Sequence, residues 1–227
     1  MCIIFIHGLG ETASIFNKIA PELNGEQVFI SLWEALGTKR RSGFKVLEFC
    51  RELIDQYAIQ KEDLIIGHST GGRLAHYIKH LNGNTVIQIA GWTAQGKPMF
   101  PIQSKQIIYF LVKSGILLSS WGRNYMIKNY RRRENSKLFY IQALENLEKG
   151  NRNCVVNQFK LALEEVDEEV KTSPDLRIHA KRDNIVRYPD EEYAEVPGDH
   201  FSLVTHPKEV VDIILPFLSA YRTSFSK

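Results

Sequence analysis

Short apolar runs rich in β-branched residues alternate along the chain with longer segments in which apolar positions recur at helical spacing. This alternation is typical of a mainly parallel sheet whose two faces are covered by helices, so it predicts an α/β fold. The predicted strands are Cys2–Ile6, Val28–Leu32, Leu64–Ile66, Thr85–Ala90, Leu176–Ala180 and Tyr193–Val196. We therefore expect a sheet of about six strands.

Three helices are expected to cover this sheet. Apolar residues between positions 44 and 57 recur at helical spacing and predict a crossover helix that starts near Ser42 or Gly43. A second helix should run from Gly72 to Leu81, with Asn82-Gly83 to end it, and a third from Pro207 to about Ala220. Pro216 lies inside the third helix and is expected to kink or shorten it.

The alternation of strand and helix fails between Gly91 and Pro174, where three helical patterns follow one another. We expect residues 1–94 and 175–227 to form the core and residues 95–174 to form an inserted helical cap. Within residues 97–133 every charged residue is Lys or Arg, and aromatic and aliphatic residues lie between them. The second half of the cap is rich in Glu and Asp, so the two halves can neutralise each other.

The composition is that of an ordinary globular protein. Hydrophobic residues make up 44% of the 227 residues, which excludes a disordered, collagen-like or coiled-coil chain, and a net charge of +3 does not indicate a nucleic-acid partner. The apolar N-terminal stretch is too short for a signal peptide and no stretch is long enough to span a membrane, so we expect a cytoplasmic protein. Cys2, Cys50 and Cys154 lie far apart, which indicates neither a disulfide framework nor a zinc site.

The segment Gly67-His68-Ser69-Thr70-Gly71 fits the pattern G-x-S-x-G. It follows a predicted strand and opens a predicted helix, which is the context that this motif requires. Small neighbours let the sharp turn close while the serine hydroxyl points out from the end of the sheet. We interpret Ser69 as a nucleophile whose neighbour Thr70 offers a backbone amide to a developing negative charge; the alternative is a glycine-rich turn without chemistry.

A second glycine-rich turn, His7-Gly8-Leu9-Gly10, directly follows the first predicted strand. Its glycines free the backbone to point the amide of Leu9 into the same cleft, where it would be a second oxyanion donor. We expect His7 itself to be structural, because a histidine at a strand end usually bonds to the neighbouring loop. The alternative for the whole tetrapeptide is an ordinary turn.

An acid and a histidine follow the last two predicted strands. Asp183 lies a few residues past the fifth strand, and His200 lies just past the sixth. Because the carboxyl ends of parallel strands meet at one edge of a sheet, Ser69, Asp183 and His200 should converge there although they are far apart in sequence. Asp199 is a rival for the acid, but its adjacency to His200 makes it harder for Asp199 to orient the imidazole.

With these motifs the chain resembles the α/β-hydrolase family from His7 to the last helix, the cap excepted. The resemblance implies that Ser69 is the nucleophile, His200 its base and Asp183 the acid that orients the base. The chain departs from the family in lacking the usual N-terminal antiparallel hairpin. It also has too few residues between Asp183 and Tyr193 for a normal crossover helix, so that helix should be a single turn or the last strand should be offset.

The implied reaction is hydrolysis of a carboxylic ester or thioester through an acyl-enzyme on Ser69, without a cofactor or a metal. Two alternatives stay open: a non-catalytic protein that binds a small molecule on the same scaffold, and a hydrolase of carbon–carbon bonds. His76 and His80 share a helix face but lack the Glu and the third ligand of a zinc-protease helix, so we interpret them as surface histidines. Glu164 to Glu169 are expected to form a solvated helix end.

The basic, aromatic-rich half of the cap suggests an acidic partner, either a carrier protein or an anionic lipid surface. The alternative is that its apolar residues only seat the cap on the core while Lys and Arg face solvent. The residues in question are Ile107, Phe110, Leu111, Leu117 and Leu118.

Overall fold

The structure is a computed structural model that describes residues 2–38, 43–93, 97–100, 102, 104–130 and 134–224. Three of the sequence-based predictions lie outside these residues: the helix start at Ser42, the domain boundary between residues 94 and 95, and the basic residues 131–133.

A six-stranded sheet in which every pairing is parallel forms the centre of the molecule. The strand order is β2-β1-β3-β4-β5-β6. The strands are β1 (Cys2–Ile6), β2 (Glu26–Ile30), β3 (Leu64–His68), β4 (Thr85–Ile89), β5 (Leu176–His179) and β6 (Ala194–Glu195). The predicted α/β fold and the positions of all six predicted strands are confirmed, with ends that differ by a few residues.

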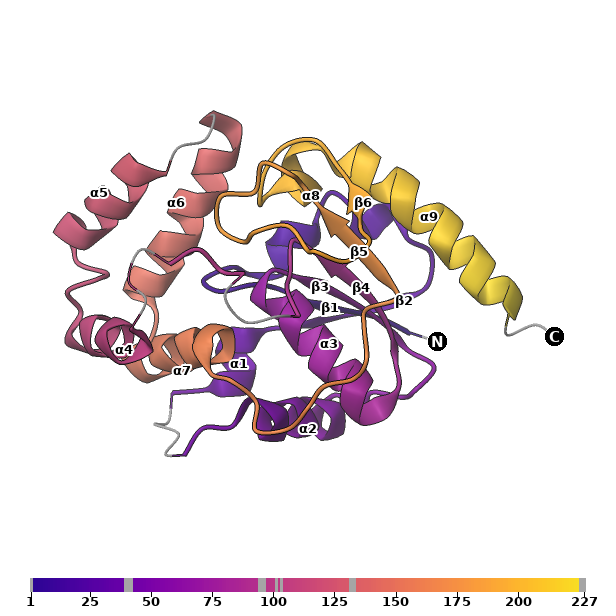
Figure 1. Cartoon of the computed structure of the whole chain (residues 1–227), viewed down its shortest axis with the longest axis horizontal. Coiled ribbons are helices and arrows are strands. Elements are labelled where there is room, and N and C mark those ends of the chain that lie inside the picture. The colour runs from indigo at the N-terminus through magenta and orange to yellow at the C-terminus, as the bar shows by residue number, and fades with distance from the viewer. Residues whose placement is uncertain are drawn as a thin grey trace.

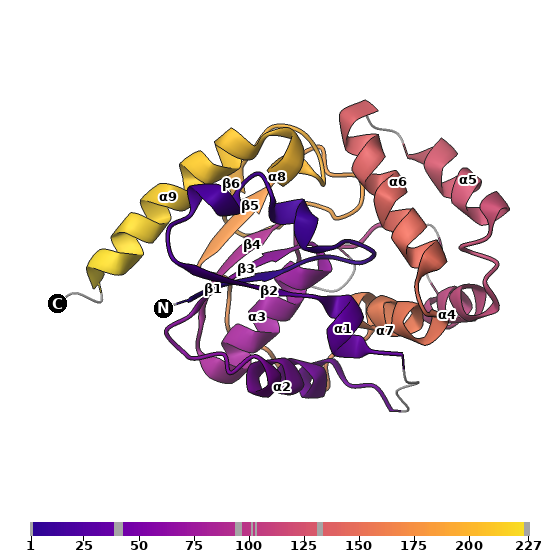
Figure 2. The same cartoon turned by 180° about the vertical axis from the view of Figure 1, so that it is seen from behind.

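Side chains alternate between the two faces of the sheet, as the pleat of a strand requires. In β1, Ile3 and Phe5 belong to one buried cluster, and Ile4 and Ile6 belong to the other. The first face is covered by the 3-10 helices η1 (Ala13–Phe16) and η2 (Ala20–Glu22) with α8 (Ser202–Thr205) and α9 (Pro207–Ser224). The second is covered by α1 (Leu32–Leu36), α2 (Val46–Gln56) and α3 (Thr70–Asn82), as Figures 1 and 2 show.

The helices that cover the sheet follow the prediction with two corrections. The first helix begins at Val46 rather than at Gly43, which lies in the left-handed region at φ 62° and is therefore not helical. α3 ends at Asn82, where Gly83 caps it with φ at 79°, as predicted from the Asn82-Gly83 pair. Pro216 does not shorten α9. Proline has no amide hydrogen to donate to the carbonyl of Asp212, but both residues are exposed, so this carbonyl can bond to water instead.

The connection from β5 to β6 contains no helix within residues 180–193, so of the two alternatives, a single helical turn or an offset last strand, the helical turn is wrong and the crossover is a loop. Only two residues of β6 pair with β5, Ala194 with Ile178 and Glu195 with His179. Asp183 lies in this loop and His200 lies just after β6. The short crossover therefore keeps both residues at the carboxyl edge of the sheet.

Four helices, one more than predicted, lie at one end of the molecule (Figure 1): α4 (Lys105–Ser114), α5 (Ser120–Asn129), α6 (Glu134–Lys149) and α7 (Arg152–Leu163). The extra break follows from Gly115, which adopts φ 82° and ends α4. Ile108, Val112, Leu144, Leu147 and Phe159 form a buried cluster between these helices. The division of the chain into a core and a cap stays a prediction.

α7 is also anchored to α3 through Arg73, whose side chain is fully buried. The guanidinium donates hydrogen bonds to the carbonyls of Leu161 and Glu164 at the end of α7, and it lies over the ring of Tyr77 at 5.1 Å. A cation at a helix C-terminus interacts favourably with the helix dipole. Arg73 thus fixes the end of α7 against α3.

Among the described residues, no helix has the length and apolarity needed to cross a bilayer.

Candidate active site

Ser69 lies at a sharp turn between β3 and α3. Its backbone adopts φ 54° and ψ −121°, a conformation that costs a non-glycine residue on the order of 1–3 kcal/mol. The turn is held by a hydrogen bond from the Ser69 amide to the Ile89 carbonyl at 2.9 Å. A Cβ atom at Gly71 would lie 2.0 Å from the carbonyl oxygen of Ile6, so the close approach of the helix to β1 requires glycine. This explains physically why glycine stands in the motif.

The structure brings Ser69, His200 and Asp183 together at the carboxyl edge of the sheet. The Oγ of Ser69 lies 3.0 Å from Nε2 of His200, and Nδ1 of His200 lies 2.8 Å from Oδ2 of Asp183. All three residues are buried, and Ser69 is 6% exposed. A proton on Nδ1 donated to Asp183 leaves Nε2 free to accept the Ser69 hydroxyl proton.

Asp183 is held as a carboxylate by partners on both oxygens. Oδ1 accepts hydrogen bonds from the amides of Ile185 and Val186, and Oδ2 faces His200 and, at 3.3 Å, Nε2 of His179. Burial by itself would raise the pKa of Asp183, but the charge of His200 and the hydrogen bonds from both histidines hold this pKa well below its usual range. Asp183 therefore presents a fixed negative charge to the imidazole of His200.

Asp199 does not take the place of Asp183. Its Oδ1 accepts a hydrogen bond from the amide of Phe201 at 3.1 Å, which fixes the turn that follows β6. The carboxylate that bonds to the His200 ring is that of Asp183.

The turn at His7 to Gly10 lies directly against Ser69. A Cβ atom at Gly8 would be 2.8 Å from Cβ of Ser69, so only glycine lets the two turns approach this closely. No described residue accepts a hydrogen bond from the amide of Leu9 or of Thr70. Their role as oxyanion donors stays a prediction.

His7 has the structural surroundings that we expected. Its Nδ1 donates to the carbonyl of Gly8 at 2.9 Å, and its Nε2 accepts from the amide of Leu32 at 3.0 Å. Burial lowers the pKa of His7, so the imidazole stays neutral and can use one nitrogen as donor and the other as acceptor.

A buried pair that the sequence analysis did not identify, Glu11 and His68, joins the turns around Ser69. Oε2 of Glu11 accepts hydrogen bonds from the Gly8 amide at 2.7 Å and from Nδ1 of His68 at 2.9 Å. Nε2 of His68 donates to the carbonyl of His200 at 2.9 Å. One carboxylate and one imidazole thus connect the Gly8 turn, the Ser69 turn and the His200 loop.

Glu11 and His68 form an ion pair. Burial would raise the pKa of Glu11, but the charge of His68 holds it below the ordinary value. Burial would lower the pKa of His68, but the carboxylate of Glu11 outweighs burial and raises it. Each group therefore favours the charged form of the other.

Glu11→Gln is expected to lower the free energy of unfolding by about 3–5 kcal/mol near pH 6, because it leaves the charge of His68 buried without its partner. Because the pKa of His68 is higher in the folded protein than in the unfolded one, the ion pair contributes its full stabilisation below the unfolded pKa of 6.5. This stabilisation is lost as pH rises through the folded pKa of His68. The destabilisation should therefore be largest below about pH 6 and should shrink as pH rises above the unfolded value. Urea unfolding over a series of pH values measures it.

The matched control for this prediction is Glu168→Gln, because Glu168 pairs with the partly exposed His80 at 3.1 Å. An exposed pair of this kind contributes little, so we expect a change below about 1 kcal/mol. If Glu11→Gln lowered the free energy of unfolding by an equally small amount, or by an amount that grows as pH rises, that result would contradict a charged pair at Glu11 and His68.

Two other groups differ from the sequence-based interpretation. His76 is buried rather than on the surface, because Nε2 of its ring bonds to the carbonyl of Thr172 at 2.6 Å where the chain crosses α3. Residues 165–169 are not a helix end, since α7 ends at Leu163 and the chain continues in a non-helical conformation. Of the two histidines His76 and His80, only His80 reaches the surface.

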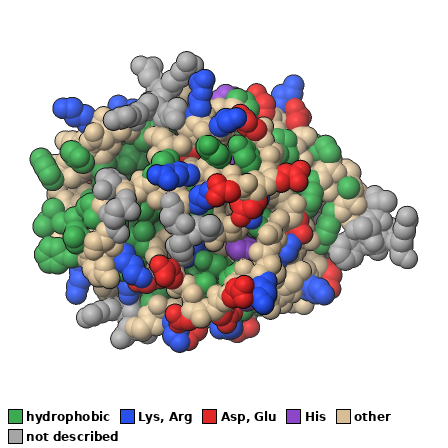
Figure 3. All heavy atoms as spheres, in the orientation of Figure 1, with side chains coloured by type: hydrophobic (Ala, Val, Ile, Leu, Met, Phe, Trp, Pro, Cys, Tyr) green, Lys and Arg blue, Asp and Glu red, His purple; other side chains and the backbone are tan. Residues whose placement is uncertain are grey.

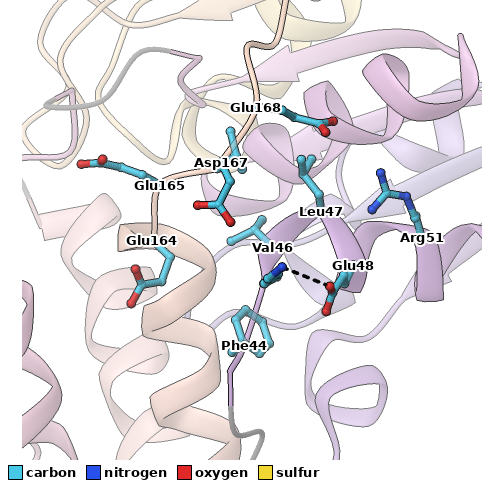
Figure 4. Close-up of a pocket in the computed structure, with 11 residues that line it drawn as sticks. Phe44, Val46, Leu47, Glu48, Arg51, Glu164, Glu165, Asp167 and Glu168 are labelled. Carbon is cyan, nitrogen blue, oxygen red and sulfur yellow. Dashed lines mark ion pairs between the residues drawn. The ribbon is translucent and has the colours of Figure 1, made fainter.

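A cavity of about 240 Å³ lies between α2 and the segment that follows α7 (Figure 4). Its lining is rich in carboxylates, from Glu48 on α2 and Glu164 to Glu168 on the segment beyond α7, with Lys45 beside Glu48. None of Ser69, Asp183 and His200 lines it. The cavity is therefore separate from the site at the carboxyl edge.

Glu11, His68 and His200 have ligand atoms within 4.8 Å of one another, which is a spacing that a metal ion could use. Both ring nitrogens of His68 and both ring nitrogens of His200 are already hydrogen-bonded to protein groups. This group of side chains therefore does not offer a set of free ligand atoms.

No family model matches the chain, and no curated protein matches it by sequence. Solved structures match it closely in fold. A hydrolase from Oleispira antarctica is 12% identical, with a TM-score of 0.70 over 96% of this chain and 90% of that one. A bromoperoxidase from Bacillus anthracis is 17% identical, with a TM-score of 0.69 over 96% and 91% of the two chains.

A thermophilic esterase from Thermogutta terrifontis is 14% identical, with a TM-score of 0.68 over 97% of this chain and 90% of that one. At these identities the likeness is one of fold. The parallel sheet covered by helices on both faces and these matches together identify the chain as a protein of the α/β-hydrolase fold.

Proposed function

We propose that this protein is a serine hydrolase that cleaves a carboxylic ester or thioester through an acyl-enzyme on Ser69. The observation that carries the proposal is the continuous hydrogen-bonded chain from Ser69 through His200 to Asp183, at a strained turn that opens a helix. The hydrolase and esterase among the matching structures support the same class of reaction.

In the first half of the reaction, Nε2 of His200 removes the hydroxyl proton of Ser69 as Oγ attacks the carbonyl carbon of the substrate. The oxyanion of the tetrahedral intermediate is held by the amides of Leu9 and Thr70, and the N-terminus of α3 adds its positive dipole. The intermediate collapses when the protonated His200 donates its proton to the leaving oxygen or sulfur. The acyl group is then bound to Ser69 through an ester.

In the second half, His200 activates a water molecule that attacks the acyl-enzyme, and the acid is released as Ser69 recovers its proton. Asp183 keeps the imidazole in the tautomer with the proton on Nδ1 and stabilises the imidazolium in both halves. Its low pKa supports this role, because the carboxylate stays ionised throughout. The proposed chemistry takes its reactive groups from the chain and from water.

A fluorophosphonate probe tests the proposal, since it reacts with a serine that has an aligned base. We expect stoichiometric labelling at Ser69, located by peptide mass spectrometry, and turnover of p-nitrophenyl esters or acyl thioesters in a series of increasing chain length. A protein that only binds a small molecule on this scaffold would leave Ser69 unlabelled. That outcome would overturn the hydrolase proposal.

A further inference from the structure

Large apolar side chains on α4, α5 and the turn between them project into solvent. Phe110 is 66% exposed and Trp121 is 74% exposed, and neither belongs to a buried cluster of the protein. The alternative that these apolar residues only seat the cap on the core is therefore wrong for Ile107 and Phe110, and Leu118 is buried in the cluster between the helices α4 to α7. Leaving such residues in water is unfavourable, and a contiguous group of them marks an interaction surface.

These side chains lie on two consecutive helices and on the turn between them, and we call them together the α4–α5 surface. Ile107 and Phe110 lie three residues apart on α4, while Trp121 and Tyr125 lie four apart on α5 with their rings stacked at 6.1 Å. Figure 3 shows hydrophobic side chains gathered at the end of the molecule where Figure 1 places α4 and α5. The surface consists of Ile107, Phe110, Ile116, Trp121, Tyr125 and the lysines Lys113 and Lys128.

The charge on this surface has a single sign. Every charged residue of the described segment 104–130 is Lys or Arg. Lys105 and Arg123 pair with Glu164 and Glu148 of the acidic half of the cap, which confirms neutralisation at these two positions. Lys113 and Lys128 are exposed, and neither pairs with a described acidic residue. The free charges of the surface are therefore positive.

We propose that the α4–α5 surface binds an anionic lipid membrane. Tryptophan and tyrosine favour the boundary between water and acyl chains, and lysines near that boundary are attracted to anionic headgroups. A second copy of this chain would bring like charges together, so self-association is disfavoured. Phe110, Trp121 and Tyr125 are each more than half exposed, which suits a fluid lipid surface better than the relief of a folded acidic protein. The proposal does not depend on the chemistry at Ser69.

Co-sedimentation of the full chain with phosphatidylcholine vesicles, with or without one third phosphatidylglycerol, tests the proposal. We expect binding to the anionic vesicles that weakens with added salt, and a blue shift of the Trp121 fluorescence that Trp121→Phe removes. Phe110→Ser with Trp121→Ser should lower the partition coefficient at least about tenfold. Lys113→Gln and Lys128→Gln should lower it about fivefold each.

The matched control is a protein with Lys208→Gln and Leu215→Ser on α9, where both residues are exposed and lie away from the α4–α5 surface. This protein, and Ser69→Ala, should bind as the unmodified protein does. Absence of binding to anionic vesicles, or equal binding by the Phe110 and Trp121 variants, would overturn the proposal. Two other results would also overturn the proposal. One is a dimer in sedimentation velocity that the α4–α5 variants abolish. The other is capture by an acidic carrier protein, without vesicle binding, that the same variants abolish.

Discussion

Ser69→Ala is expected to lower kcat/KM for an activated ester by about 10⁵-fold or more, because removal of the nucleophile from a working triad removes the acyl-enzyme route altogether. The hydroxyl of Ser69 is the only group of the site in hydrogen-bond contact with Nε2 of His200 among the described residues. Steady-state hydrolysis of p-nitrophenyl acetate, followed by absorbance, measures the loss.

The control for this variant is Ser219→Ala, since Ser219 is an exposed serine on α9 whose hydroxyl bonds to the carbonyl of Leu215. Ser219→Ala should hydrolyse the ester at the rate of the unmodified protein. If Ser69→Ala retained more than about a tenth of that rate while folded, another group would have to be the nucleophile.

Asp183→Asn is expected to lower kcat by about 10⁴-fold with little change in KM. An amide at this position can donate to Nδ1 of His200, which favours the tautomer with the proton on Nε2, and that nitrogen can then no longer accept the proton of Ser69. The variant also removes the negative charge that stabilises the imidazolium. Ester hydrolysis across a range of substrate concentrations separates kcat from KM.

Asp199→Asn is the matched control, because Asp199 is a buried acid next to His200 that bonds to the amide of Phe201 and not to the imidazole. The amide oxygen of asparagine can accept the same hydrogen bond, so kcat should stay within about threefold of the unmodified value. A larger loss at Asp199→Asn than at Asp183→Asn would reverse the assignment of the acid.

The positions of Ser69, Asp183 and His200 were predictable because each depends on a local pattern and one topological rule. An apolar β-branched run predicts a buried strand, and the carboxyl ends of parallel strands share one edge, so residues that follow β3, β5 and β6 must lie near one another. Ser69, Asp183 and His200 needed no further information. Asp183 was preferred over Asp199 because Asp199 is adjacent to His200 in sequence, and an adjacent side chain is poorly placed to orient the imidazole.

Glu11 and His68 were not identified as part of the site because the groups that they join lie far apart in the sequence. His68 is 57 residues from Glu11 and 132 residues from the carbonyl that it bonds to. A signal was present, since His68 stands inside the serine motif at the end of a buried strand, where a polar side chain requires a partner. The sequence could indicate the need for a partner at this point but could not identify Glu11.

The errors in the helices arose where the apolar periodicity of the sequence did not carry the information that decided the structure. Gly115 ends α4 because its backbone adopts the left-handed region, which the apolar periodicity on either side does not reveal. His76 is buried because the non-helical segment at Thr172 crosses α3. Ile107 and Phe110 continue an apolar helical pattern and yet face water. Periodicity predicts that a helix has an apolar face but does not identify what covers that face.

The most direct test of the central claim is to trap the covalent intermediate. The protein is mixed with a slowly hydrolysed ester such as p-nitrophenyl pivalate, quenched in acid, and examined by intact mass and by peptide mass spectrometry. We predict one added acyl group per chain, located on Ser69. A variant of Asp183 or His200 that slows deacylation more than acylation should accumulate more of this adduct. Continued turnover with no adduct, or an adduct on a residue other than Ser69, would contradict the claim that Ser69, His200 and Asp183 act together in acyl transfer.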